Sequence, residues 1–99
     1  MRFLILLSSD CSSLNEVISA IKSQGNEVGV LLVQDGVFLM DKGCEHSSEL
    51  AHLKVPVYAS KSHIEERGIS NRLALDVKVV DYPEIIDLIM ENYDKTVSI

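Results

Sequence analysis

Residues 2–8 read Arg-Phe-Leu-Ile-Leu-Leu-Ser and are apolar everywhere except at their two ends. A strand with one face in solvent alternates apolar and polar residues, whereas an uninterrupted apolar run is typical of a strand buried on both faces. Residues 28–33, Val-Gly-Val-Leu-Leu-Val, show the same pattern. The two runs together predict a parallel sheet that is covered on both of its faces.

The chain between these two strands predicts a helix. Its apolar residues recur at the spacing i, i+3, i+4 and i+7, at Leu14, Val17, Ile18 and Ile21. Ser13 and Glu16 have the spacing of a capping box, which places the start of the helix near Ser13. Gly25 provides a typical end. A strand, a helix and a second strand in this order form the crossover that joins parallel strands.

Two further segments, residues 55–59 and 77–80, are rich in valine and predict a third and a fourth strand. Residues 49–53 predict a short helix between the second and the third strand. Residues 37–40, Val-Phe-Leu-Met, fit either a helical turn or an extension of the second strand. Phe38, Leu39 and Met40 either fold back into the core or expose an apolar patch that favours association with another protein.

The last two helices have recognisable ends. Ser62 and Glu65 have capping-box spacing, and Gly68 closes the short helix that they open. Asp81 precedes a proline and an acidic residue in the first turn, which makes it the N-cap of a final helix that runs through Tyr93. Strands and helices therefore alternate along the chain, and we predict a single α/β domain over residues 1–99.

Composition and charge exclude several classes of protein. The chain has 99 residues, of which 46% are hydrophobic and 24% charged, and this is an ordinary globular composition. Its net charge of −6 argues against a protein that binds nucleic-acid backbones directly. From Asp76 onward six acidic residues face two basic ones, which indicates either a solvated helix face or a docking surface for a basic partner.

The first residues have only a superficial likeness to a signal peptide, because the apolar run is short and polar residues replace a small-residue cleavage site. We expect a buried strand of a cytoplasmic protein there, and no apolar run is long enough to span a membrane. The two cysteines, Cys11 and Cys44, are too few for a disulfide scaffold. In a reducing cytosol they are expected to be thiols.

Candidate reactive residues lie in the loops that follow the strands, where parallel sheets place their ligands. Cys11 comes between the first strand and the first helix, where helix amides lower the pKa of a thiol, while Asp10 beside it opposes that effect. An accessible thiol of lowered pKa can carry a persulfide or a phosphoryl group, and Cys11 is our candidate site for such a group. Cys44 and His46 suggest half of a metal site, but the other ligands that zinc requires are missing, so we predict no metal.

Four segments of the chain agree in order and spacing with one known family. They are residues 31–37 (Leu-Leu-Val-Gln-Asp-Gly-Val), 57–59 (Val-Tyr-Ala), 64–69 (Ile-Glu-Glu-Arg-Gly-Ile) and 79–88 (Val-Val-Asp-Tyr-Pro-Glu-Ile-Ile-Asp-Leu). The chain thus resembles the DsrH/TusB family of sulfur-relay proteins over essentially its whole length, with poorer agreement in residues 8–16 and 41–54. The resemblance implies a DsrE-like, three-layer α/β/α fold with a mainly parallel sheet of four to five strands.

The resemblance also implies a function. It predicts a cytoplasmic subunit that takes part in persulfide sulfur transfer, toward 2-thiolation of the tRNA wobble uridine or toward dissimilatory sulfur oxidation. The implied partners are further copies of the chain, or DsrE/TusD- and DsrF/TusC-type subunits, with a DsrC/TusE-type protein as acceptor. We expect no cofactor and no direct contact with nucleic acid or membrane. The chain is expected to be no enzyme alone, and at most a persulfide carrier within a sulfurtransferase complex.

Seven residues match the family pattern, namely Gln34, Asp35, Gly36, Arg67, Gly68, Asp81 and Tyr82. We expect structural roles for them ahead of chemical ones, with Gly36 adopting a positive φ after its strand and Gly68 ending a helix. In such complexes the main sulfur-carrying cysteine belongs to the DsrE/TusD-type subunit. Some DsrH-type members carry one on the first helix, but this place falls near Ala20 here.

Two alternatives remain open. A cysteine just after the first strand of a small α/β domain also resembles the IIB components of sugar phosphotransferase systems, in which the thiolate is phosphorylated. Asp10 and the absence of glycine from this loop fit that reading poorly. The other alternative is a redox-inert scaffold domain, in which replacing both cysteines changes nothing except packing.

Overall fold

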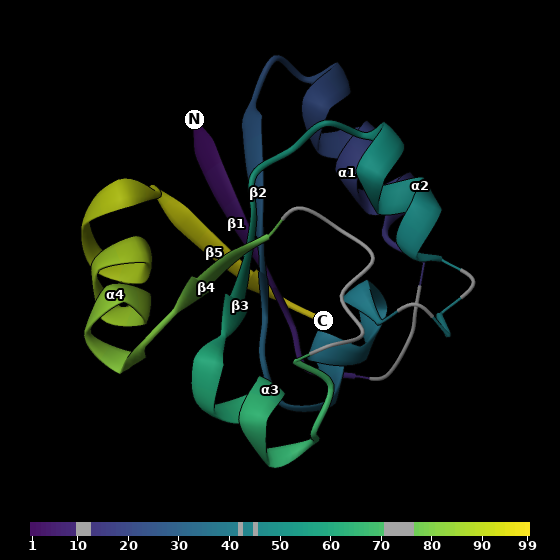
Figure 1. Cartoon of the computed structure of the whole chain (residues 1–99). Helices are drawn as coiled ribbons and strands as arrows, with labels where there is room; N and C mark the ends of the chain where they lie inside the picture. The colour runs from purple at the N-terminus through teal and green to yellow at the C-terminus, as the bar shows by residue number, and fades with distance from the viewer. Residues whose placement is uncertain (10–12, 42, 45, 71–76) are drawn as a thin grey trace.

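A parallel sheet forms the centre of the molecule. The computed structural model describes residues 1–9, 13–41, 43–44, 46–70 and 77–99. Within these residues, five strands pair in the order β4-β3-β2-β1-β5, all parallel. Their bounds are β1 Arg2–Leu7, β2 Glu27–Leu32, β3 Val57–Ser60, β4 Lys78–Val80 and β5 Lys95–Ser98. The predicted parallel sheet of four to five strands is confirmed (Figure 1).

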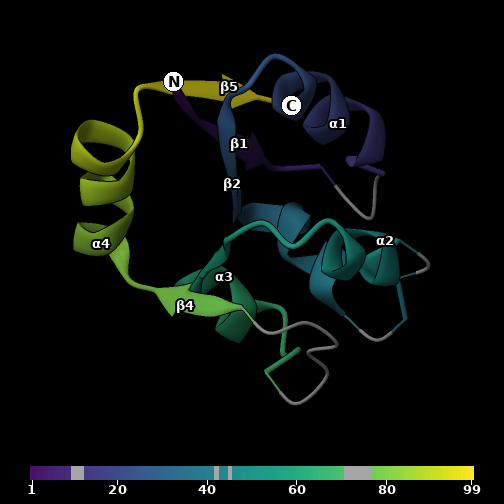
Figure 2. The same cartoon turned by 90° about the horizontal axis from the view of Figure 1, so that it is seen from above.

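Helices cover both faces of this sheet. One face carries α1 (Asn15–Ser23), α2 (Ser47–His52), α3 (Lys61–Glu66) and the 3₁₀ helix η1 (Gln34–Met40). The other face carries α4 (Tyr82–Asp87), which continues into the π-helical turn η2 (Leu88–Asn92). Figure 2 shows α4 on one side of the sheet and α1 with α2 on the other. The three-layer α/β/α arrangement follows from this placement.

The central strands are apolar throughout because their alternate residues enter two different cores. Ile5 and Leu7 of β1 pack with α1 and η1, whereas Leu4 packs on the other face with Leu88 and Tyr93. All three β1 side chains are fully buried. A strand that supplies both cores has no solvent-facing side, which explains the uninterrupted apolar runs that predicted it.

Residues 37–40 fold back into the core. They belong to η1, in which Val37, Leu39 and Met40 are completely buried and Phe38 is partly buried against the same cluster. The alternative that this segment exposes an apolar patch for association is therefore wrong. Four apolar residues in a row are ambiguous in sequence because a buried 3₁₀ turn and a buried strand have the same composition.

The expectation that Gly36 adopts a positive φ is also wrong. Gly36 has no positive φ, and the left-handed residue of this turn is Gln34, at φ 49°. A side chain on Gly36 would collide with the backbone carbonyl of Leu7, so the glycine is required by the close approach of η1 to β1. Gly68 behaves as predicted, because it ends α3 with φ 64°.

The helix starts differ in how well sequence predicted them. Asp81 caps α4, and together with Glu84 it forms the capping box that the sequence indicates. The expected box of Ser13 and Glu16 is absent: α1 begins at Asn15 without a side-chain cap, and the Ser13 hydroxyl donates instead to Glu49 Oε2 at 2.8 Å. Capping-box spacing also placed the start of α3 too late, because this helix begins at Lys61 with no side-chain cap.

The last strand, β5, follows the final helix and was not predicted from the residues. We expected helix through Tyr93, but η2 ends at Asn92 and the chain then pairs with β1, from Phe3 opposite Lys95 to Leu6 opposite Ser98. All four residues of β5 are exposed, as is common for a strand at a sheet edge. Because β5 lacks a buried apolar face, its sequence carries no period that distinguishes it from a loop.

Candidate functional site

A pocket of about 350 Å³ lies at the carboxyl ends of the strands and is our candidate functional site. Polar side chains come from the segments that follow β2, β3 and β4: Gln34, Ser60, Ser62, His63 and Tyr82. The apolar wall comes from β1, from the end of β2 and from the last helix: Leu6, Val33, Ile85, Ile86 and Ile89. We call this hollow the carboxyl-end pocket. Ligands of open parallel sheets bind at this edge.

His63 is held in one tautomer by the backbone of Gln34. The Gln34 amide N–H donates to His63 Nδ1 at 2.8 Å, and the left-handed conformation of Gln34 accompanies this contact. Because Nδ1 accepts a hydrogen bond, the ring proton of the neutral imidazole lies on Nε2. The ring therefore offers one N–H donor beside an apolar wall. Such an arrangement suits recognition of a polarisable or anionic group better than proton abstraction.

Asp35 and Arg67 form a link beneath this pocket. Arg67 Nε and Nη2 each lie 3.0 Å from Asp35 Oδ1, and Arg67 Nη1 donates to the His63 carbonyl at 3.3 Å. One arginine thus ties the start of η1 to α3, the helix that carries His63. The structure therefore gives these two family-pattern residues a positioning role, and it brings them together from segments more than thirty positions apart.

The family-pattern residues of α4 and α3 differ in how close they lie to the pocket. Asp81 Oδ1 accepts from the Glu84 amide at 3.1 Å and fixes the first turn of α4. Tyr82, the next residue, lies at the pocket rim with 75% of its surface exposed. Gly68 ends α3 away from the pocket lining. Of the seven matched residues, Gln34 and Tyr82 line the pocket directly.

Cys44 is not among the residues that line the carboxyl-end pocket. Cys11, our candidate persulfide site, lies outside the described residues. Cys44 is nearly buried and is disulfide-bonded, so it differs from the free thiol that we expected. Among the described residues, no group of three or more His, Cys, Asp or Glu side chains is arranged to hold a metal ion.

Glu49 links the start of α2 to the residues before α1. It accepts the Ser13 hydroxyl bond and lies 3.3 Å from His46 Nδ1. The Ser13 hydrogen bond, followed by that of His46, holds the pKa of the Glu49 carboxyl below its usual value. His46 is thereby engaged with a neighbouring carboxylate, and the half-site of Cys44 and His46 shows no further ligands in the described part of the chain.

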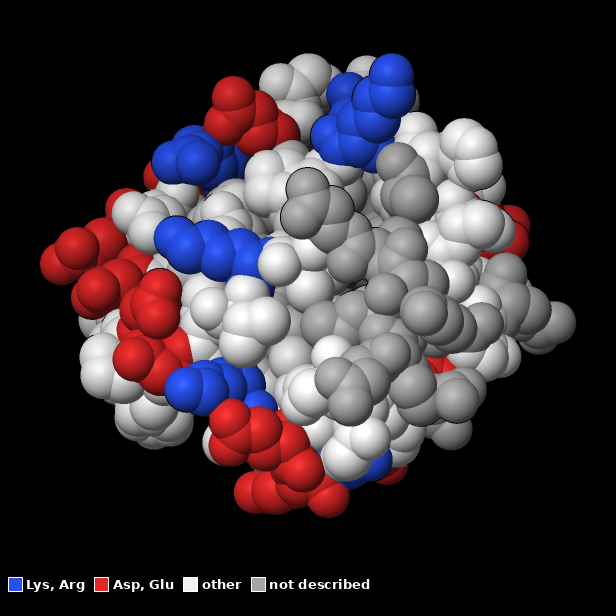
Figure 3. Space-filling model, in the orientation of Figure 1, with Lys and Arg blue, Asp and Glu red and all other residues white. Residues whose placement is uncertain are grey.

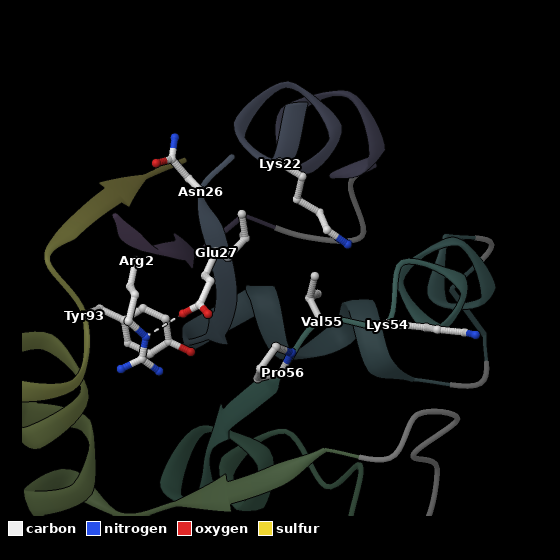
Figure 4. A pocket seen from close by; sticks show the side chains of 9 residues that line it. Arg2, Lys22, Asn26, Glu27, Lys54, Val55, Pro56 and Tyr93 are labelled. Atoms are coloured by element: carbon white, nitrogen blue, oxygen red, sulfur yellow. Dashed lines mark ion pairs between the residues drawn. The ribbon is translucent and has the colours of Figure 1, made fainter. Parts of the chain in front are cut away.

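A second pocket, of about 390 Å³, lies at the amino ends of the strands (Figure 4). Arg2 is engaged on two sides, because its Nε lies 3.0 Å from Glu27 Oε2 and its guanidinium stacks over the Tyr93 ring at 4.9 Å. Lys22 donates to the Leu53 carbonyl, and Figure 4 shows Lys54 pointing away. Burial, and then the contact with Tyr58, raises the pKa of the Tyr93 hydroxyl. These contacts join strands to α4 and give no sign of a ligand.

Sequence reasoning missed the central residue of the carboxyl-end pocket. His63 was not singled out from the sequence, although it lies just beyond the third strand, in the first turn of α3. The signal that identifies it is positional, because side chains just beyond neighbouring parallel strands meet at one edge.

In the described part of the chain, none of the helices has the length and apolar character of a membrane span.

Comparisons with known proteins agree on one family. Residues 8–95 match the family model described as DsrH like protein. Protein TusB of Photorhabdus laumondii is 30% identical over 79 residues, covering 80% of this chain and 81% of that protein. Protein TusB of Escherichia coli O1:K1 is 30% identical over 70 residues, covering 71% and 72%.

Two solved structures share the fold. The ychN protein of E. coli covers 100% of both chains with a TM-score of 0.76 at 19% identity. MTH1491 of Methanobacterium thermoautotrophicum, a protein of unknown function, has a TM-score of 0.74 at 19% identity and covers 99% of this chain and 98% of its own. At this level of identity the likeness concerns the fold alone, and it agrees with the DsrE-like architecture that the resemblance implied.

Proposed function

Because the chain belongs to the DsrH family, we propose that it is a subunit of a sulfur-relay complex of the tRNA-thiolating type. The observation that carries the proposal is the family match over residues 8–95, together with the TusB relatives. We place the protein in the cytoplasm. Its partners are DsrE/TusD- and DsrF/TusC-type subunits, and sulfur leaves the complex for a DsrC/TusE-type acceptor.

Within that complex the chain acts mainly through assembly and positioning. The carboxyl-end pocket supports this role, because its described lining contains a hydrogen-bonding rim and apolar side chains but no thiol. Its imidazole has Nδ1 engaged as an acceptor. A pocket of this kind can receive a side chain or a persulfide group of another subunit without carrying out the bond-breaking step itself.

Cys11 is the proposed accessory persulfide site. In such a step its thiolate attacks the outer sulfur of a donor persulfide, a new S–S bond forms, the donor's S–S bond breaks, and the donor leaves as a thiolate. The transfer needs no external oxidant because one persulfide replaces another. The step requires the cysteines of the chain in the reduced state, which a cellular thiol reductant supplies. Cys44 is the weaker candidate, since it is nearly buried.

Complementation tests the proposal. We expect deletion of the gene to abolish 2-thiouridine in tRNA, measured by mass spectrometry of nucleosides, and wild type to restore it. Cys11→Ser and Cys44→Ser should both restore it if the chain mainly assembles the complex. Failure of Cys11→Ser alone, with loss of its one-sulfur mass gain after incubation with a cysteine desulfurase and cysteine, would make the chain an obligatory carrier. Unchanged thiolation after deletion would overturn the proposed function.

A further inference from the structure

The last helix exposes apolar side chains on the side that faces away from the sheet. Tyr82, Ile86 and Met90 follow one another at intervals of four residues and are 75%, 45% and 75% exposed. The inward side of the same helix is apolar as well, because Leu88 is buried in the second core and Ile85 and Ile89 pack against it. A helix with apolar residues on both sides is typically covered on both sides. Among the residues that the structure describes, only the sheet side of this helix is covered.

Acidic residues border this apolar stripe. Glu84, Asp87 and Glu91 are exposed, and Figure 3 shows acidic side chains gathered on the side of the molecule where Figure 1 places α4. Asp87 and Glu91 are four residues apart, a spacing at which like charges destabilise a helix. Neither makes an ion pair with another described residue. Glu91 also lies near the helix C-terminus, where the dipole disfavours negative charge.

These charges work against the helix that carries them. No basic residue occupies the last turn of α4 or of η2, so this segment offsets none of the repulsion itself. Lys78 of β4 lines a small hollow together with Glu84 and Asp87. Like charges four positions apart and an acid near the helix C-terminus both disfavour the helix. Such departures from local preference are typical of functional surfaces. The π-helical turn over Leu88–Asn92 is a further irregularity of the same segment, and π-helical turns are frequent at functional sites.

The stripe is continuous with the carboxyl-end pocket. Tyr82 and Ile86 belong to both, so the exposed surface passes directly into a hollow of about 350 Å³. A flat apolar stripe offers little shape for recognition, whereas a stripe beside a hollow can accept a protruding side chain at its centre. Anchor residues that fill pockets contribute most of the affinity in protein interfaces.

We propose that this surface, defined by Tyr82, Ile86 and Met90 with the acidic rim of Glu84, Asp87 and Glu91, docks another subunit of the relay complex. The partner presents an apolar patch with one protruding side chain, surrounded by lysine and arginine. A second copy of this chain fits poorly, because a two-fold contact would bring Asp87 and Glu91 against the same acids. The proposal rests on the proposed function, since that supplies the partner.

Co-expression with the TusC- and TusD-type subunits of the same genome tests the docking surface. We expect Ile86→Glu to weaken assembly at least tenfold, as measured by titration of the purified subunits. The double change Asp87→Lys with Glu91→Lys should weaken it about tenfold at low salt and less at high salt, because it reverses the rim. Val97→Glu is the matched control: Val97 is 36% exposed on β5, outside this surface, and should leave affinity unchanged.

The outcomes separate the two proposals. If wild type assembles and Ile86→Glu and the charge reversal assemble equally well, the docking surface is wrong while the proposed function stands. If wild type binds neither subunit, both are overturned. If the chain alone forms oligomers that Ile86→Glu dissociates, the occupant is a second copy and the proposal fails. The charge reversal lies on exposed side chains, so it tests the surface even where Ile86→Glu affects folding.

Discussion

At the scale of single residues, His63 connects the pocket to the backbone that shapes it. Its Nδ1 accepts the amide of Gln34, a residue held at a positive φ. We expect His63→Ala to lower the free energy of unfolding by about 1 kcal/mol, because this amide loses its partner. His63→Asn should retain most of the stability, since the asparagine oxygen can accept at the place of Nδ1. Urea unfolding of the purified variants measures both effects.

His52 provides the control for this comparison. It is exposed on α2, and its Nδ1 contacts only the Ser48 carbonyl of its own helix, at 2.7 Å. His52→Ala should therefore change stability by less than about 0.5 kcal/mol. Equal losses for His63→Asn and His63→Ala would show that ring packing, and not the hydrogen bond from Gln34, is what His63 contributes.

Only some of the residues that line the carboxyl-end pocket could be predicted from the sequence. Gln34 and Tyr82 were found because they lie in segments that resemble a family, and both line the pocket. His63 was not found, since a histidine has no pattern of its own and its role depends on the left-handed turn at Gln34. A positive φ at a glutamine has no sequence signature, because glycine is the residue that normally indicates it.

At the scale of elements, the start of α4 determines how Tyr82 and the residues after it are presented. Asp81 Oδ1 accepts from the Glu84 amide, and Glu84 Oε1 accepts from the Asp81 amide. We expect Asp81→Ala to reduce stability by about 1 kcal/mol, because the Glu84 backbone amide loses its acceptor, while Asp81→Asn should lose much less. Thermal unfolding followed by circular dichroism provides the measurement.

Ser13 is the natural comparison because its sequence pattern predicts the same kind of cap. In the structure α1 has no side-chain cap, and the Ser13 hydroxyl bonds to Glu49 on the surface. Ser13→Ala should then cost less than about 0.5 kcal/mol. A loss as large as that of Asp81→Ala would mean that Ser13 caps α1 after all.

Elements were predictable where local pattern and tertiary burial agree. β1 and β2 were identified from their apolar runs because each supplies two cores, and α4 was identified from Asp81 and Pro83. β5 was missed because its four residues are exposed and pair only with β1. The capping box of α1 was wrong because Ser13 found a partner in Glu49, which is distant in sequence.

At the scale of the whole molecule, the two cores are expected to unfold together. They lie on opposite faces of one sheet, but β1 and β2 supply side chains to both. Loss of either core would leave these strands with one apolar face in water, which links the stability of the two faces. We therefore expect a single cooperative transition in urea, as the prediction of one domain over residues 1–99 requires.

Tyrosine fluorescence can test this coupling because the chain has no tryptophan and only three tyrosines. Tyr58 and Tyr93 lie in or against the second core, with ring centroids 6.5 Å apart, and Tyr82→Phe removes the exposed third signal. Far-UV circular dichroism mostly reports α1, α2 and α3, which cover the first core. The two signals should have the same midpoint, because neither face of the shared strands is stable alone. A tyrosine transition at lower urea would show that α4 and its core form a separate unit.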